Sequence, residues 1–119
     1  VLKGLIFMVF VINKLKYDTD KMVLVSEKCS YAYNTYFLNS KIKYVGENVK
    51  LWKSAKGNWF LTYEDYFENK YGKVMDKNEV EELLLKYDLE KYEEIFGELE
   101  EAKEIFEKLI TVKKERSDA

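Results

Sequence analysis

The chain has 119 residues and a formal net charge of -2, which fits a single domain with a modest core. It contains no histidine, no proline and one cysteine. These counts exclude a histidine general base, Ser-His-Asp and Cys-His nucleophiles, Cys/His zinc sites and an internal disulfide.

The apolar content and the charge pattern indicate a folded chain with two different halves. Hydrophobic residues make up 47% and aromatic residues 16% of the sequence, more than a disordered chain normally carries. Residues 1–75 contain twelve lysines and seven acidic residues, whereas residues 76–119 contain eight basic and fifteen acidic residues. The two parts are therefore electrostatically different.

The N-terminal region begins with an apolar run at residues 5–12, LIFMVFVI. The run is too short to span a bilayer and lacks a following cleavage site. We expect a buried central strand here. The alternatives are a weak secretion or membrane signal, or a non-native extension over residues 1–21 that precedes a domain starting at Met22. The domain is expected to cover residues 22–110, with a frayed tail at 111–119.

The next segments alternate between strand and turn patterns. Residues 22–25 predict a strand and 26–30 a turn, and the tyrosine-rich residues 31–38 are expected to pair with 41–45 across Asn39-Ser40. Residues 46–48 form the next predicted turn. The short connections favour antiparallel pairing.

The clearest supersecondary pattern is a hairpin at residues 49–63, VKLWKSAKGNWFLTY. Leu51 and Trp52 point to opposite faces of the first strand, and the second strand also has apolar residues on both faces. Gly57 suits the loop position that needs a positive φ. A hairpin of this kind needs further strands and a helical layer. The polar residues 64–73 are predicted to be a loop or a short helical turn.

The C-terminal part has helical periodicity. Asp76 with Glu79 predicts a capping box, and apolar residues then recur at helical spacing. Asp88 predicts a second helix start and Gly97 its end. Residues 98–110 predict a third helix that packs on the sheet or forms a dimer seam. The predicted fold is α+β, an antiparallel sheet of about four strands with two or three C-terminal helices on one face.

Three motifs resemble a group of small uncharacterised bacterial and phage proteins. These are LWKSAKGNWFL at 51–61, NEVEELL at 78–84 and YEEIFGELEEA at 92–102. The group shows an LY-x4-GxFFL hairpin and a YEEIFGEVEEA ending, and the resemblance covers about residues 47–102. It implies a compact accessory protein of a phage or mobile element and no catalytic residue. The glycine-rich aromatic middle of the group is replaced here by TYEDYFENKYGK.

Few residues remain that suit catalysis. Glu64, Asp65 and Glu68 are considered as Mg²⁺ ligands, but the expected role of this segment is a solvated loop. Cys29, next to Lys28, is expected to be a half-buried structural thiol. We therefore expect a non-enzymatic protein without cofactor or metal.

Two binding modes are predicted. The first is the action of a phage-type or mobile-element-type accessory or inhibitor, whose acidic helices contact a protein partner with a basic surface. The residues are Glu94, Glu98, Glu101 and Glu104. The alternative is single-stranded nucleic-acid binding by cations interleaved with rings, through Lys41, Lys43, Lys50, Trp52, Lys53 and Lys56. A cytoplasmic location, no membrane partner and a homodimer through the last helix complete the expectations.

Overall fold

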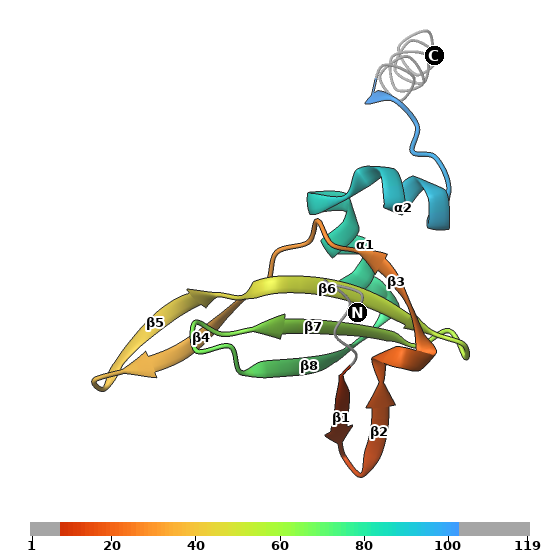
Figure 1. Cartoon of the computed structure of the whole chain (residues 1–119). Helices are drawn as coiled ribbons and strands as arrows, with labels where there is room; N and C mark the ends of the chain where they lie inside the picture. Colours follow the sequence, from red (N-terminus) through yellow and green to blue (C-terminus); the bar gives the residue numbers. More distant parts are fainter. Residues whose placement is uncertain (1–7, 103–119) are drawn as a thin grey trace, which may run out of the picture.

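The computed structural model describes residues 8–102 and confirms an α+β fold (Figure 1). Eight strands precede two helices in this part of the chain. The strands are β1 (Val9–Ile12), β2 (Leu15–Asp18), β3 (Met22–Ser26), β4 (Ala32–Phe37), β5 (Ser40–Val45), β6 (Glu47–Ser54), β7 (Trp59–Glu64) and β8 (Lys70–Met75). A 3-10 turn (Thr19–Lys21) follows β2, and the helices are α1 (Lys77–Tyr87) and α2 (Leu89–Phe96).

The predicted central hairpin is confirmed as β6 and β7. It forms the middle of a four-stranded antiparallel sheet with the order β3-β6-β7-β8. Leu51 pairs with Leu61 in the register of the two strands. Gly57 has a φ of 86° and donates its N–H to the Ser54 carbonyl at 2.9 Å, so it fills the loop position that disfavours a side chain.

The two faces of this sheet have different covers. On one face, Leu51 and Leu61 form the core with Val80 and Leu84 of α1. On the other face, the Phe60 ring contacts rings of the β1–β2 hairpin. Figure 1 shows the helices on one side of the central sheet and this hairpin on the other. The apolar residues predicted on both faces of the central hairpin are thus both covered.

The prediction of a buried central strand at residues 5–12 is wrong for its described part. β1 pairs only with β2, outside the central sheet. Val9 and Val11 are exposed, and only the alternate residues Phe10 and Ile12 are partly covered. Within β1, the Phe10 ring contacts Phe60 of the central sheet, whereas Val9 and Val11 point away from it.

The prediction of a loop or a short helical turn over residues 64–73 holds for residues 65–69 and is wrong for the remainder. Residues 65–69 form the loop, and β8 begins at Lys70 as an edge strand of the central sheet. Leu61 pairs with Lys73, and Thr62 pairs with Gly72. Lysines and glycine on an exposed edge remove the apolar alternation that identifies a strand in sequence.

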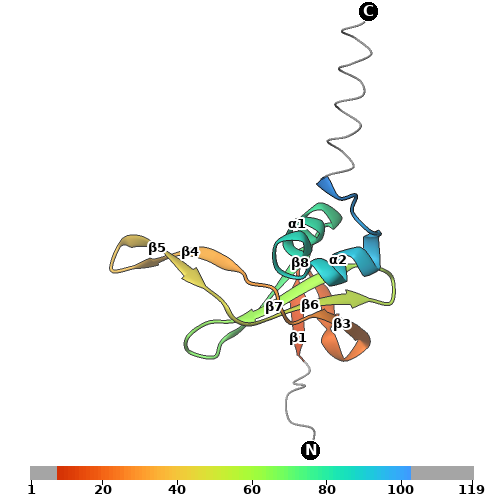
Figure 2. The same ribbon diagram turned by 90° about the horizontal axis from the view of Figure 1, so that it is seen from above.

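β4 and β5 form a separate two-stranded hairpin, which we call the arm. Their predicted pairing is confirmed, with Tyr33 opposite Tyr44 and a turn at Leu38 and Asn39, where φ is 50° and 66°. They are not part of the central sheet, contrary to the expectation of one sheet. Figures 1 and 2 show the arm extending away from the sheet and helices.

The helix boundaries agree with the sequence signals up to Gly97. Asp76 and Glu79 form the predicted capping box of α1, and Asp88 caps α2. Gly97 ends α2 with a φ of 104°. Residues 98–101 have no regular secondary structure, and most of the predicted third helix lies outside the described residues. Neither α1 nor α2 has the length and apolar content to cross a bilayer.

Candidate interaction site

The arm sorts its side chains onto two faces with different chemistry. Alternation and register place Tyr33, Thr35, Phe37, Ser40, Ile42 and Tyr44 on one face, which we call the uncharged face. They place Ala32, Asn34, Tyr36, Lys41, Lys43 and Val45 on the opposite face, which we call the lysine face. The arm therefore offers an uncharged surface and a basic surface back to back.

A group of tyrosine rings fixes the base of the arm to the central sheet. The Tyr63 ring lies 4.7 Å from Tyr31 and 5.4 Å from both Tyr33 and Tyr71, centroid to centroid. Burial and neighbouring tyrosines raise the pKa of Tyr63. Burial, together with the charge of Asp65, also raises the pKa of Tyr33. The Tyr33 and Tyr63 hydroxyls therefore stay neutral at physiological pH and add no charge at the base of the arm.

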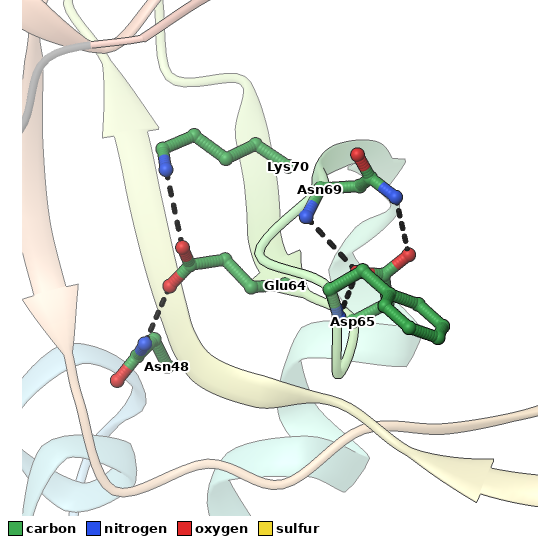
Figure 3. Close-up of polar contacts among 6 residues, drawn as sticks. Asn48, Glu64, Asp65, Asn69 and Lys70 are labelled. Carbon is green, nitrogen blue, oxygen red and sulfur yellow. Dashed lines mark hydrogen bonds and ion pairs between the residues drawn. The ribbon is translucent and has the colours of Figure 1, made fainter.

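The β7–β8 loop, residues 65–69, is held by Asp65 (Figure 3). Its carboxylate accepts hydrogen bonds from the Phe67 and Asn69 N–H groups at 2.8 and 2.9 Å, and from the Asn69 amide and the Tyr71 hydroxyl at 2.9 and 3.0 Å. Desolvation opposes ionisation, but these bonds hold the pKa of Asp65 below its ordinary value. The result is an ordered loop that keeps the Phe67 side chain 80% exposed.

Glu64 precedes this loop and has its own partners. It accepts hydrogen bonds from Asn48 Nδ2 and from Lys70 Nζ, the latter at 3.1 Å (Figure 3). The Asp65 carboxylate thus holds the loop, whereas Glu64 links the end of β7 to β6 and β8. Among residues 8–102, no three acidic or cysteine side chains are grouped to hold a metal ion.

The six residues predicted to bind nucleic acid do not share one surface. Lys41 and Lys43 are exposed on the lysine face, and Lys56 lies in the β6–β7 loop. Lys53 lies 4.9 Å above the Trp59 ring, on the helix side of the sheet. Lys50 lies on the other side, where its charge lowers the pKa of Glu64.

Trp52 cannot stack on a base in this structure. Its side chain is 1% exposed, and its Nε1 donates to Thr62 Oγ1 at 2.9 Å. The exposed ring beside the predicted lysines is instead Tyr36, which is directly opposite Lys41.

The predicted acidic residues are only partly brought together. Glu94 lies on α2 and pairs with Lys91 at 3.0 Å. Glu98 and Glu101 are exposed beyond Gly97, where the chain is not helical, so these three do not form one helical face. Glu104 lies outside the described residues.

Cys29 is a buried structural residue. Its Sγ lies 3.7 Å from Ser26 Oγ, which donates to Asp88 Oδ2 at 2.6 Å. Burial, with the negative charge of Asp88, raises the pKa of Cys29 despite the Ser26 contact. A raised pKa suppresses the reactive thiolate. The structural role expected for this cysteine fits the geometry, although it is buried rather than half-buried.

Four exposed apolar residues at turns of the described part of the chain were not predicted from the sequence. Phe37 is 64% and Leu38 83% exposed at the end of the arm, and Tyr66 and Phe67 are exposed in the β7–β8 loop. Their position next to a turn was a usable signal, because a turn carries its side chains away from the core. The comparisons add no assignment, since no family model, curated protein or solved structure matches the chain.

Proposed function

We propose that the chain is a non-enzymatic binding protein that contacts a protein partner through exposed apolar side chains. The contact residues are Phe37, Leu38 and Ile42 of the arm and Tyr66 and Phe67 of the β7–β8 loop. The observation that carries the proposal is the exposure of Phe37, Leu38 and Phe67 on elements held by pairing and hydrogen bonds. Removing exposed apolar surface from water is favourable by about 25 cal/mol per Å² of transfer free energy, so a partner that covers these side chains is stabilised on them.

A binding role is favoured over catalysis by the polar groups near these residues. The Asp65 carboxylate accepts four hydrogen bonds that shape the loop. The one thiol is buried with a raised pKa, and the sequence has no histidine. A reducing, cytoplasmic setting and an accessory role in a mobile element complete the proposal.

The exposed Glu98 and Glu101 fit the predicted partner with a basic surface, as a second contact. They lie on the acidic C-terminal part of the chain, which steers a basic partner over a long range. The exposed apolar residues then provide most of the binding free energy, and the acidic residues orient the partner.

Photo-crosslinking in cells that express the protein tests this proposal. A photoreactive phenylalanine replaces Phe37 or, as a control, Val11, which is also exposed but lies on β1. We expect a discrete covalent adduct from position 37 that weakens with Leu38→Ser and is absent from position 11. Equal labelling from both positions, or no adduct from position 37, contradicts the proposal.

Single-stranded nucleic acid is a second candidate ligand, favoured by two observations on the arm. Tyr36 is opposite Lys41, and no acidic residue occurs between Glu27 and Glu47. Cations beside an exposed ring suit phosphate and base contacts.

Fluorescence anisotropy with single-stranded RNA and DNA tests this candidate. Binding that weakens steeply with salt is expected, and the double variant Lys41→Glu/Lys43→Glu is expected to abolish it. The matched control Lys14→Glu/Lys16→Glu makes the same charge change on the β1–β2 hairpin. Equal losses in both double variants mean that net charge, not the lysine face, determines binding.

A further inference from the structure

A cavity of about 530 Å³ opens at the end of the central sheet that carries the β6–β7 loop. Its lining comes from β2, the 3-10 turn, the start of β3 and the β6–β7 loop. Strand register brings these segments together, because Met22 at the start of β3 pairs with Ser54 at the end of β6. Figure 1 shows the start of β3 beside the β6–β7 loop. The volume lies within the range of small-molecule sites, about 300–1,000 Å³.

The apolar wall of this cavity comes from both the sheet and the β1–β2 hairpin. Met22 and Phe60 line the cavity and share the face of the sheet that carries Trp52. Leu15 and Tyr17 share one face of β2, and the Tyr17 ring stacks on Phe60. Leu15 is nevertheless 60% exposed. An apolar side chain on the sheet-facing side of the hairpin is thus left open to the cavity.

Cations from three separate segments surround this apolar wall. They are Lys16 of β2, Lys21 of the 3-10 turn and Lys56 of the β6–β7 loop. All three are exposed, and none of them forms an ion pair within residues 8–102. Asp18 is the only acidic residue that the described part of the chain contributes to the lining, and its carboxylate accepts the Asp20 N–H at 3.0 Å. The cavity therefore has an excess of positive charge.

A second cavity of similar volume, between the β6–β7 loop and α2, has lysines that already have partners. There, Lys53 lies 4.9 Å above the Trp59 ring, and Lys77 lies 3.8 Å from Glu81. The cavity beside β2 differs because its lysines are free to pair with a ligand. Lysines favour an anionic group, and the apolar wall favours an apolar body that it removes from water. One ligand that carries both parts satisfies both requirements.

We propose that the cavity beside β2 binds a small organic anion, a phosphate or carboxylate group on an apolar body. The inference goes beyond the proposed function, since neither the arm nor the β7–β8 loop lines this cavity. The acid group lies among Lys16, Lys21 and Lys56, and the apolar body covers Leu15 and Met22. Because exposed lysines are solvated and flexible, the affinity is modest, with a dissociation constant on the order of 10–100 µM.

Fluorescence titration of the full chain with anilinonaphthalene sulfonate tests the proposal, because this probe is an anion with an apolar body. The expected result is saturable enhancement that weakens with salt. The double variant Lys16→Gln/Lys56→Gln is expected to weaken binding by roughly fivefold to tenfold. The matched control Lys41→Gln/Lys43→Gln removes the same charge from the lysine face of the arm, outside the cavity, and is expected to leave the dissociation constant unchanged.

The apolar wall gives an independent readout. Leu15→Ala is expected to weaken binding by roughly threefold, because it removes apolar contact area. Leu85→Ala is the control, since Leu85 is an exposed leucine on α1 that does not line the cavity. All the substituted side chains are exposed, and circular dichroism establishes that each variant is folded. Binding that is insensitive to Lys16→Gln/Lys56→Gln, or equally weakened by both lysine pairs, overturns the inference. The absence of saturable binding also overturns it.

Competition identifies the acid group. Displacement of the probe by phenyl phosphate alone assigns a phosphate ester, displacement by octanoate alone assigns a carboxylate, and displacement by both means that the cavity accepts either group. Inorganic phosphate lacks the apolar body and benzyl alcohol lacks the charge, so neither is expected to compete at the same concentration. Equal competition by inorganic phosphate, or none by either organic anion, overturns the inference. These results are independent of crosslinking from position 37, which tests the proposed function.

Discussion

At the residue scale, Glu64 shows how a surface carboxylate becomes a determinant of stability. Desolvation raises its pKa, but hydrogen bonds from Asn48 and Lys70 and the charges of Lys70 and Lys50 outweigh that effect. The net result is a pKa below its ordinary value of 4.5. Because the folded-state pKa is lowered, Glu64 contributes stability above the unfolded-state pKa and loses it as the pH falls through the folded-state pKa.

The prediction for Glu64 concerns acid unfolding. We expect Glu64→Gln to lower the urea midpoint at about pH 7 and to reduce the fall in that midpoint between about pH 7 and pH 3. Glu47→Gln is the control, because Glu47 is the exposed residue opposite Glu64 on β6. Parallel pH profiles for the wild type and Glu64→Gln contradict the assignment.

Gly72 illustrates close packing at a single residue. A Cβ at this position would lie 2.3 Å from Phe60 Cζ and 3.0 Å from Phe10 Cγ. Glycine is therefore required on β8 by the ring above it.

We expect Gly72→Ala to destabilise the protein by about 1–3 kcal/mol through overpacking. The same substitution is expected to cost less in a Phe60→Leu background, where the ring edge is absent. Urea unfolding of the four proteins gives this coupling as a double-mutant cycle. Equal costs in both backgrounds mean that the Phe60 ring is not the obstacle.

At the element scale, the two helices start with aspartates in different surroundings. Asp76 is exposed and forms a capping box with Glu79 at the start of α1. Asp88 is buried, caps α2 through the Lys91 N–H at 3.3 Å, and accepts the Ser26 hydroxyl from β3 at 2.6 Å. One side chain therefore defines a helix start and ties that helix to the sheet edge.

The two caps give a matched prediction. We expect Asp76→Ala to cost about 1 kcal/mol, the usual value for a lost cap. Asp88→Ala is expected to cost about 2–3 kcal/mol, because it also leaves the buried Ser26 hydroxyl without its acceptor. Chemical unfolding measures both, and equal costs contradict a structural role for the Ser26–Asp88 bond.

At the scale of the whole molecule, two segments far apart in sequence sandwich the central sheet. The helices cover the Leu61 face, and the β1–β2 hairpin covers the Phe60 face. The Tyr17 ring lies 4.9 Å from the Phe60 ring, at an interplanar angle of 2°. The described part of the N-terminal region therefore packs against the sheet.

We expect Tyr17→Ala to destabilise the protein by about 1–3 kcal/mol, since it uncovers part of Phe60. Leu15→Ala, on the same strand but exposed, is expected to change stability by less than about 0.5 kcal/mol. A chain starting at Met22 is expected to melt at a lower temperature and to aggregate. Unchanged melting of that shortened chain means that the hairpin is dispensable for the fold.

Features that depend on a few neighbouring residues were predictable from the sequence. These include the β6–β7 hairpin with Gly57 in its loop, the capping box at Asp76, the cap at Asp88 and the stop at Gly97. Each is decided by backbone sterics or by a hydrogen bond within one turn, so a short window contains the whole physical cause.

Which faces of the strands and helices pack together became known from the fold alone. The sequence could not show that Trp52 is buried while Tyr36 is exposed, because both occur in strands with lysines nearby. It also could not separate the arm from the sheet, identify β8 as an edge strand, or place the β1–β2 hairpin over Phe60. These outcomes depend on contacts between residues distant in sequence, and alternation assigns a side chain to a face without saying what covers that face.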